Sequence, residues 1–378
     1  MKVYLDNAAT TAIDKEVFEE MLPYFQEHFG NPSSIHSFGR KTRAAIEKAR
    51  KIVATNLHVS PSEIFFTSGG TEAINTAITK SVADLGIKNI ITSKIEHHAV
   101  LHTAESLNQV GKVKLHYVRL VDNGHINMEH LEELLISNEK CLVTLMHANN
   151  EIGNLLPLKA VADLCEKYNA IFHSDSTQTI SHYKIDLQSI NVHMINGAAH
   201  KFHGPKGIGF LYLSNKVKIQ PFIYGGSQER NMRGGTENLY GIVGMGKAFE
   251  VAHRDIAAHH EYIQGLKTYM IEQLKKNIVG IEFNGDAEGS SLYTILNVLF
   301  PPTENAEMML FNLDISGIAV SGGSACASGS NQDSHVLKNI GSDMSRPSVR
   351  FSFSKFTTKE EIDFTLLKLK AMFLMKVK

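Results

Sequence analysis

Two residues near the middle of the sequence, an aspartate and a lysine, each follow a short apolar run. Asp175 comes shortly after the run 170–172, and Lys201 lies in the segment 196–207, which begins after the apolar run 192–195. Such runs are typical of buried strands, and the glycines and Pro205 that follow break the strand pattern. Lys201 is therefore predicted on a loop just past a strand end. Partial burial there lowers the pKa of an amine and makes it nucleophilic.

Lys201 alone fits an ordinary surface lysine beside a tight turn, and that interpretation is the better one without further evidence. Asp175 changes the assessment, because a carboxylate and an amine at strand ends of one sheet suit pyridoxal phosphate. The carboxylate keeps the ring nitrogen of this cofactor protonated as an electron sink, and the amine forms the Schiff base.

The elements that must position these residues follow from the pattern of the chain. Between residues 63 and 212, helical patterns alternate with seven strand candidates: 64–67, 89–92, 114–118, 141–146, 170–173, 193–195 and 208–213. This alternation predicts an α/β fold with a mostly parallel seven-stranded sheet between helices. Ligands of such sheets bind at the carboxyl ends of the strands.

Helices are expected at 14–28, 37–57 and, as one long stretch, 241–276. Strands near 280–283, 292–299 and 348–353 and a final helix from Thr358 indicate a smaller α+β domain, which the extended piece 3–5 completes. We therefore expect a large domain at 13–255 and a small domain formed by 1–12 with 256–378.

The composition excludes several classes of protein. The 378 residues carry 38 Lys+Arg against 39 Asp+Glu, a formal charge of -1, so no nucleic-acid or membrane surface is indicated. No apolar run is long enough to span a bilayer, and the N-terminus lacks a signal-peptide pattern. The three cysteines, Cys141, Cys165 and Cys326, argue against disulfides and zinc and for the cytoplasm. Core packing explains Cys141 and Cys165.

Further polar residues follow other strand candidates. Gly70 and Thr71 begin a helix whose N–H groups could bind an anion, although a plain helix cap is an equal interpretation. His97 could stack on a ring or move protons, and Asn150 and Gln178 could hydrogen-bond a ligand. Each has an ordinary alternative as a turn or helix-start residue, but turn chemistry alone does not explain why all of them fall on one sheet edge.

Two residues of the C-terminal part have types suited to chemistry. Cys326 lies in a run of small residues, 320–330, where an exposed thiol can ionise and attack, unless the segment is only a linker. Arg350 faces away from the apolar face of its strand, where a guanidinium suits capture of a carboxylate. An ordinary solvent-facing arginine is the alternative.

At this point the sequence resembles the cysteine desulfurases, a family of fold-type I, aminotransferase class V pyridoxal-phosphate enzymes. The resemblance covers nearly the whole chain. It is carried by the motifs at 4–11, 68–72 (Ser-Gly-Gly-Thr-Glu), 96–98 (Glu-His-His), 149–153, 175–178 (Asp-Ser-Thr-Gln), 200–201, 233–238 and 323–326 (Gly-Ser-Ala-Cys).

The resemblance implies a role for each site residue. Lys201 would form the Schiff base, His97 would stack on the pyridine ring, Asp175 would pair with its nitrogen, and Gln178 would bind its hydroxyl. The remaining implied roles are phosphate binding by Gly70, Thr71 and His200, phosphate binding in a partner subunit by Thr236, substrate carboxylate binding by Asn150 and Arg350, and persulfide formation on Cys326.

The role of Thr236 implies a homodimer, and the form of the Cys326 motif is similar to that of the subgroup with a mobile cysteine loop. Two features depart from the family pattern. Ala198 stands where many members have a serine on the phosphate, which weakens cofactor binding by about 1 kcal/mol, one hydrogen bond. The segment 341–346 is also unusual.

The activity that this resemblance implies is removal of sulfur from L-cysteine, giving L-alanine and a persulfide on Cys326. An acceptor, such as an iron–sulfur scaffold protein or the tRNA-thiolation machinery, then takes the sulfur. The alternatives are a selenocysteine lyase or other β-lyase, an aminotransferase of the same fold, and a scaffold-binding relic without cofactor. The sequence names neither the acceptor nor the preference between cysteine and selenocysteine.

Overall fold

A seven-stranded sheet forms the centre of the computed structural model, which describes residues 1–303, 306–322 and 334–374. In spatial order its strands are β2 (Ile64–Thr67), β8 (Gly209–Leu213), β7 (Met194–Ala198), β6 (Ile171–Asp175), β5 (Cys141–Thr144), β3 (Asn89–Thr92) and β4 (Lys114–Tyr117). Only β8 runs against the other strands. The expected mostly parallel α/β sheet is therefore confirmed.

Two strands continue further than the apolar pattern predicts. β6 runs to Asp175 and β7 to Ala198, because Asp175 pairs with Asn196 and Ala198 pairs with Gly209 in the ladder. Gly197 fits inside the strand because a Cβ there would lie 2.5 Å from the ring of Phe210. The strand therefore ends just three residues before Lys201, on a short 3-10 turn at Ala199–Lys201.

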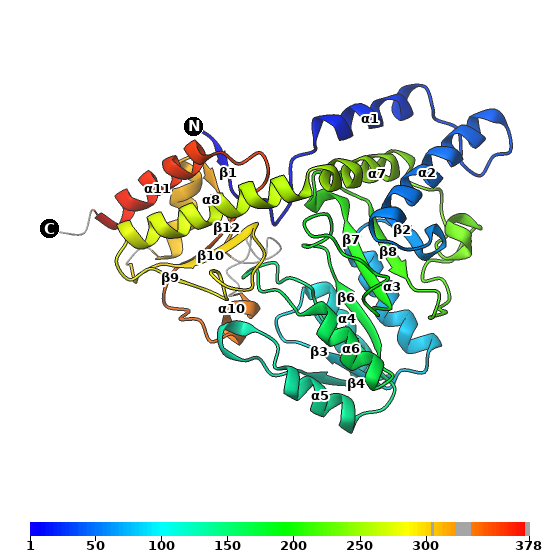
Figure 1. Cartoon of the computed structure of the whole chain (residues 1–378), viewed down its shortest axis with the longest axis horizontal. Coiled ribbons are helices and arrows are strands. Elements are labelled where there is room, and N and C mark those ends of the chain that lie inside the picture. The colour runs from blue at the N-terminus through cyan, green and yellow to red at the C-terminus, as the bar shows by residue number, and fades with distance from the viewer. Residues whose placement is uncertain (304–305, 323–333, 375–378) are drawn as a thin grey trace.

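Helices cover both faces of this sheet (Figure 1). One face packs against α1 (Lys15–Gln26), α2 (Ser37–Asn56), α5 (Met128–Ser137), α6 (Leu158–Lys167) and α7 (Leu239–Arg254). The other face packs against α3 (Gly70–Asp84) and α4 (His98–Gln109). Strand residues alternate between the two cores: Cys141 and Val143 join the first, and Leu142 joins the second.

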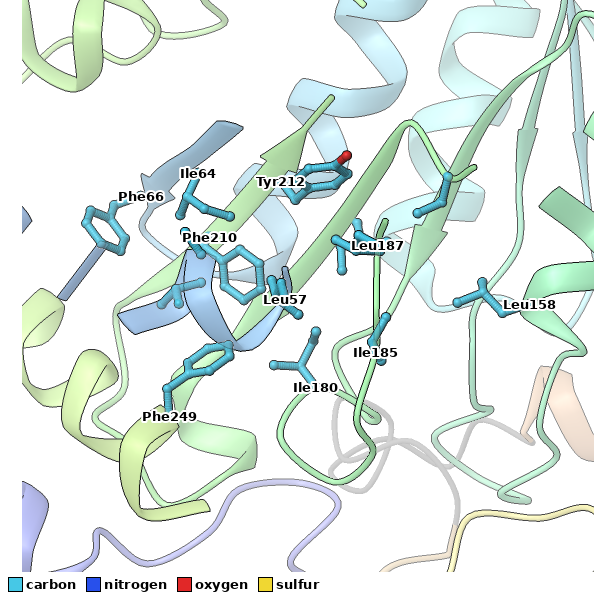
Figure 2. Packing of buried hydrophobic residues seen from close by; sticks show 14 of the residues in the cluster. Leu57, Ile64, Phe66, Leu158, Ile180, Ile185, Leu187, Phe210, Tyr212 and Phe249 are labelled. Atoms are coloured by element: carbon cyan, nitrogen blue, oxygen red, sulfur yellow. The ribbon is translucent and has the colours of Figure 1, made fainter. Parts of the chain in front are cut away.

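Aromatic rings fill much of the first core (Figure 2). Phe210 of β8 meets Phe249 of α7 edge-to-face, with ring centroids 5.6 Å apart. Leu57 and Ile180 lie close to this pair in Figure 2. This packing anchors the strands whose ends carry the polar residues considered above.

A second, smaller group of elements lies at one end of the molecule, where Figure 1 shows the chain's N-terminal strand. It contains an antiparallel sheet of β12 (Ser348–Ser352), β10 (Ile295–Leu299) and β9 (Glu282–Phe283), and a parallel pair of β1 (Val3–Tyr4) with β11 (Ile318–Ala319). Its helices are α8 (Ile256–Asn277), α9 (Met309–Ile315), α10 (His335–Asn339) and α11 (Lys359–Leu374). Apart from α10, these elements share their own apolar core, to which Val3 and Leu5 contribute. Val336 and Leu337 of α10 pack with Ile95 and Ile152 instead.

The stretch 241–276 is not the single helix expected from its pattern. α7 ends at Arg254 and α8 begins at Ile256, because Asp255 between them has φ -118° and ψ 18°. Figure 1 shows α8 running from the end of α7 to the smaller group of elements. The domain limits at residues 12 and 255 remain a prediction.

The remaining short 3-10 turns are Pro61–Glu63, Asp122–Gly124, Gln228–Asn231 and Ala306–Met308. Within the described ranges, no helix is both long and apolar enough to cross a membrane.

A buried ion pair holds the glycine-rich loop 224–235 against the sheet. Glu229, 3% exposed, accepts hydrogen bonds from both terminal nitrogens of Arg50, at 2.7 and 2.8 Å, and from the Phe66 amide. The Arg50 guanidinium also lies 4.5 Å from the centroid of the Phe66 ring. Glu229 keeps these bonds although its φ is 45°, in the left-handed region.

We predict that Glu229→Gln lowers the free energy of unfolding by about 3 kcal/mol, because Arg50 then loses its buried counter-charge and keeps only the more exposed Glu47 carboxylate. Urea unfolding of the variant measures this loss. Glu47→Gln is the matched control, because Glu47 also contacts Arg50 but its side chain is 43% exposed. This variant should lose less than about 1 kcal/mol of the free energy of unfolding. Equal losses in the two variants would contradict the role of burial.

Candidate active site

Lys201 lies where the N-terminal segment crosses the carboxyl edge of the sheet. Its Nζ donates to the carbonyl oxygens of Ala8, at 2.6 Å, and Ala9, at 2.9 Å. The side chain is half-buried. The same segment holds the turn on which Lys201 sits, because Thr11 donates to the His200 carbonyl from both its amide, at 2.9 Å, and its hydroxyl, at 3.0 Å.

Asp175 ends β6 and is 6% exposed. Its Oδ1 accepts three hydrogen bonds: from the Thr177 amide at 3.0 Å, the Thr177 hydroxyl at 2.6 Å and the Asn196 side-chain amide at 2.8 Å. Within the described part of the chain no group donates to its Oδ2. One carboxylate oxygen is therefore fixed by the protein, and the other remains open to a ligand.

Gln178 and His200 meet the same N-terminal segment. Gln178 Nε2 donates to the Ala8 carbonyl at 3.0 Å, so Gln178 and Lys201 share one acceptor. His200 Nδ1 lies 3.2 Å from the Thr10 hydroxyl. Burial lowers the pKa of His200 to about 4, with smaller contributions from Lys201 and Lys206, so this imidazole is neutral near pH 7.

His97 is the N-cap of α4, where its Nδ1 accepts the Ala99 amide at 3.1 Å. Burial lowers the pKa of His97, while the charge of Asp175 acts in the opposite direction and that of Lys201 adds to the shift. A neutral ring therefore sits within electrostatic reach of both residues. His97 is a helix-start residue, as the ordinary alternative expects, but it is half-buried and not fully in solvent.

Gly70 begins α3, the helix that follows β2. A Cβ at this position would lie 3.1 Å from the Thr177 hydroxyl and 3.9 Å from the Ala198 Cβ, so the helix start approaches the ends of β6 and β7 closely. Thr71 is exposed and does not cap the helix, since the N-cap is Gly69 without a side-chain bond. The N–H groups of this turn are suited to binding an anion.

Arg350 of β12 is 1% exposed, so the solvent-facing alternative is wrong for it. Its Nη1 donates to the backbone oxygen of Asn150 at 2.8 Å, and its Nη2 pairs with Asp6 at 2.8 Å. Asn150 thus meets Arg350 through its main chain. Sequence analysis assigned no role to Asp6, and no local pattern signals a partner 344 positions away.

Thr236 is exposed and directly follows the loop 224–235, which the buried pair of Arg50 and Glu229 anchors. Cys326 lies outside the described residues. On either side of it, the Ser321 backbone pairs with that of Arg350, and the Ser334 hydroxyl bonds Glu151. Cys141 and Cys165 are buried, as their apolar surroundings predict.

These groups fit pyridoxal phosphate: an open carboxylate oxygen for the ring nitrogen, an amine for the aldehyde, a neutral imidazole, and helix N–H groups for the phosphate. Ala198, 2% exposed, offers only a methyl group on this side. No cluster of His, Cys, Asp or Glu that could hold a metal ion occurs in the described residues.

Comparison with known proteins agrees with this geometry. The aminotransferase class-V family matches residues 3–364. The chain belongs to this family. A relative named cysteine desulfurase IscS, from Clostridium botulinum (strain Hall), is 44% identical over 371 residues, which cover 97% of this chain and 92% of the relative. The chain is therefore a member of the cysteine desulfurases, and the resemblance seen in its motifs is confirmed.

Solved structures agree as well. A structure named as a NifS-like protein has a TM-score of 0.91 and 36% identity, covering 99% of this chain and 100% of the other. A structure named SspA in complex with cysteine has a TM-score of 0.82 and 31% identity, covering 95% of this chain and 100% of the other. The fold class predicted from the sequence is thereby confirmed.

Four buried or half-buried histidines predict that the folded state loses stability in acid. Burial lowers the pKa of four imidazoles to about 4, those of His147, His182, His200 and His203. In the unfolded chain these groups take up a proton near pH 6.5. Between pH 6.5 and 4 the unfolded state therefore binds more protons, and stability falls as the pH falls.

Glu96 has the opposite effect, because burial raises its pKa to about 8 and the folded protein then holds the extra proton. For these five groups together the net difference is about three protons, or roughly 4 kcal/mol per pH unit near pH 5. Urea unfolding of the apoprotein at several pH values measures this slope. The variant His182→Gln should reduce the slope by the equivalent of about one proton. The variant His36→Gln, at an exposed histidine, should leave the slope as in the wild type. Equal slopes in the two variants would refute the role assigned to His182.

Proposed function

We propose that this protein is a pyridoxal-phosphate-dependent cysteine desulfurase that converts L-cysteine to L-alanine and leaves a persulfide on Cys326. The observation that carries the proposal is the convergence of Lys201, Gln178 and Arg350 on one N-terminal segment, residues 6–11. The names of its relatives, and the cysteine in the complex with SspA, support the same substrate.

Pyridoxal phosphate supplies an electron sink that stabilises negative charge on the substrate carbon next to the amine. Lys201 would hold its aldehyde, Asp175 Oδ2 its ring nitrogen, Gln178 its hydroxyl, and His97 its ring face. Gly70, Thr71 and His200 would hold the phosphate. Of the chain's own groups, Lys201 is placed to take the proton from that carbon, because an amine released from the cofactor is a base.

Arg350 would bind the substrate carboxylate with Asn150 beside it. In the structure Asp6 occupies Arg350 Nη2, so Asp6 and the incoming carboxylate compete for one guanidinium. Asp6 is the more exposed partner, with a side chain 20% exposed against 1% for Arg350. Exchange of one carboxylate for another keeps the buried arginine paired throughout.

Cys326 would act as a thiolate on the sulfur of the substrate. The carbon–sulfur bond of cysteine breaks, a sulfur–sulfur bond forms on Cys326, and the three-carbon skeleton keeps the electron pair and takes up a proton to leave as alanine. The outer sulfur of the persulfide then passes to an acceptor protein of iron–sulfur cluster assembly or tRNA thiolation. A cytoplasmic location belongs to this proposal and is supported by the two free, buried cysteines among the described residues.

A homodimer is part of the same proposal. α1 and the residues after it expose an apolar row at 18, 22, 25 and 29, in which Phe25 also stacks on Tyr240 of α7. Exposed apolar surface of this kind favours association with a second copy. Thr236, exposed next to the anchored loop 224–235, would then reach the phosphate of the partner's cofactor.

The alternative activities are distinguished by Cys326. A selenocysteine lyase, another β-lyase or an aminotransferase needs the cofactor but not this thiol. A relic that has lost its cofactor would stay colourless when pyridoxal phosphate is added, whereas the proposed enzyme turns yellow and borohydride fixes the cofactor on Lys201.

We predict that Cys326→Ser keeps its bound cofactor but loses persulfide formation and sulfur transfer to acceptors. Mass spectrometry after incubation with L-cysteine measures the persulfide on the protein, and an alanine assay measures turnover of the substrate. The control is Cys141→Ala, which removes a buried thiol from the sheet and should form the persulfide normally. Sulfur transfer to a protein acceptor by the Cys326→Ser variant would refute the persulfide step.

We also predict that Asp6→Asn lowers the KM for L-cysteine roughly 3- to 10-fold, because Arg350 loses a competing carboxylate worth about 1 kcal/mol. Inhibition by sulfate should become stronger for the same reason. Steady-state kinetics at constant ionic strength test this. Asp14→Asn, which breaks an ion pair with Lys355 instead, should leave the KM unchanged; a raised KM in Asp6→Asn would count against the competition.

A further inference from the structure

We propose that Thr144, His173 and Asn196 form a buried, one-directional hydrogen-bond relay whose function is to position Asp175 toward the cofactor ring. The proposal rests on the proposed function, since it concerns how the protein prepares the group that meets the ring nitrogen. None of these three residues was singled out as a site residue from the sequence. They act through Asp175 and are positioning residues.

The relay crosses three neighbouring strands. The Thr144 hydroxyl on β5 lies 2.8 Å from His173 Nδ1 on β6, and His173 Nε2 lies 3.0 Å from Asn196 Oδ1 on β7. Asn196 Nδ2 returns to β6, donating to Asp175 Oδ1 at 2.8 Å and to the Thr177 hydroxyl at 2.9 Å. Thr144, His173 and Asn196 are each 0% exposed, so no water replaces these bonds.

The chemistry of the end groups fixes the direction of every bond. A carboxylate only accepts, so the Asn196 atom that faces Asp175 must be the amide nitrogen, and its oxygen then faces His173. His173 must therefore carry its proton on Nε2. Burial lowers the pKa of His173, and the neutral ring accepts the Thr144 proton on Nδ1. Each donor thus points toward Asp175.

Two consequences follow for the carboxylate. The relay delivers Asn196, and through it the Thr177 hydroxyl, to the same oxygen, Oδ1, and leaves Oδ2 without a donor among the described residues. Aligned donors in a buried chain also strengthen one another. Asp175 is thereby held in one orientation, with Oδ2 left open for a ring nitrogen.

Thr144 is the point at which the relay can be tested without touching the site. In Thr144→Val, His173 Nδ1 loses its donor, so only the Asp175 end of the relay still opposes a joint reversal of the His173 proton position and the Asn196 amide. A reversed Asn196 would turn its oxygen toward the Asp175 carboxylate and repel it. Thr144→Ser keeps the hydroxyl and should rescue. Thr365→Val is the matched control, because Thr365 is also 0% exposed but donates only to the Glu361 carbonyl in α11.

The experiment measures pyridoxal-phosphate binding to the apoprotein and the pH dependence of the absorbance of the bound cofactor. We expect Thr144→Val to bind the cofactor about 3- to 10-fold more weakly, as loss of one hydrogen bond implies. The midpoint of its absorbance titration should move by about half a pH unit. Thr144→Ser and Thr365→Val should match the wild type in both. The titratable groups that sense the charge of Asp175 are Glu96, His97 and His173, and all three are retained.

Unchanged affinity and midpoint in Thr144→Val would overturn the relay, and so would equal changes in Thr365→Val. A wild-type protein that takes up no cofactor would instead overturn the proposed function. If Thr144→Val does not fold, Asn196→Asp carries the test, since it is nearly isosteric and sets a second carboxylate against Asp175. We expect it to lose cofactor affinity more strongly than Thr144→Val, and wild-type affinity in this variant would refute the proposal.

Discussion

The carbonyl oxygen of Ala8 is the acceptor on which the arrangement of the site depends. It accepts hydrogen bonds from Lys201 Nζ at 2.6 Å and from Gln178 Nε2 at 3.0 Å. The amide of Ala8 donates to the Ser352 hydroxyl at 2.8 Å. One residue of the N-terminal segment thereby joins the ends of β6 and β7 to β12. The large sheet supplies the amine and the carboxylate, the smaller sheet supplies the arginine, and this segment sets the spacing between them.

The part of the site that the sequence could predict is the part that parallel-sheet topology dictates. Apolar runs located all seven strands of the central sheet, and the residues after them fall on its carboxyl edge for that reason. The apolar pattern located the ends of the strands less accurately. The pattern ended β7 at Ile195, whereas pairing with β8 carries it through Gly197, because the Phe210 ring packs over the bare backbone there.

What the sequence could not predict are the bonds between distant polar groups. Nothing near Asp6 indicates Arg350, and nothing near Asn196 indicates that its amide serves Asp175 rather than a turn. Buried polar groups must find partners, but the identity of the partner follows only from the fold. Hydrophobic periodicity also gave no sign of the break at Asp255, since the residues on both sides continue the apolar face.

The N-terminal segment also determines when, during folding, the contacts of the candidate site can form. Asp6 and Ala8 depend on Arg350 and Ser352, residues 344 positions later in each case. Contacts of such long sequence separation form late in folding, because chain closure over that length is entropically costly. During synthesis the first residues emerge long before their partners, so the nascent chain has no complete binding place for a small reactive aldehyde or for a thiol-bearing amino acid. These contacts of the candidate site can therefore form only after nearly the entire polypeptide has left the ribosome.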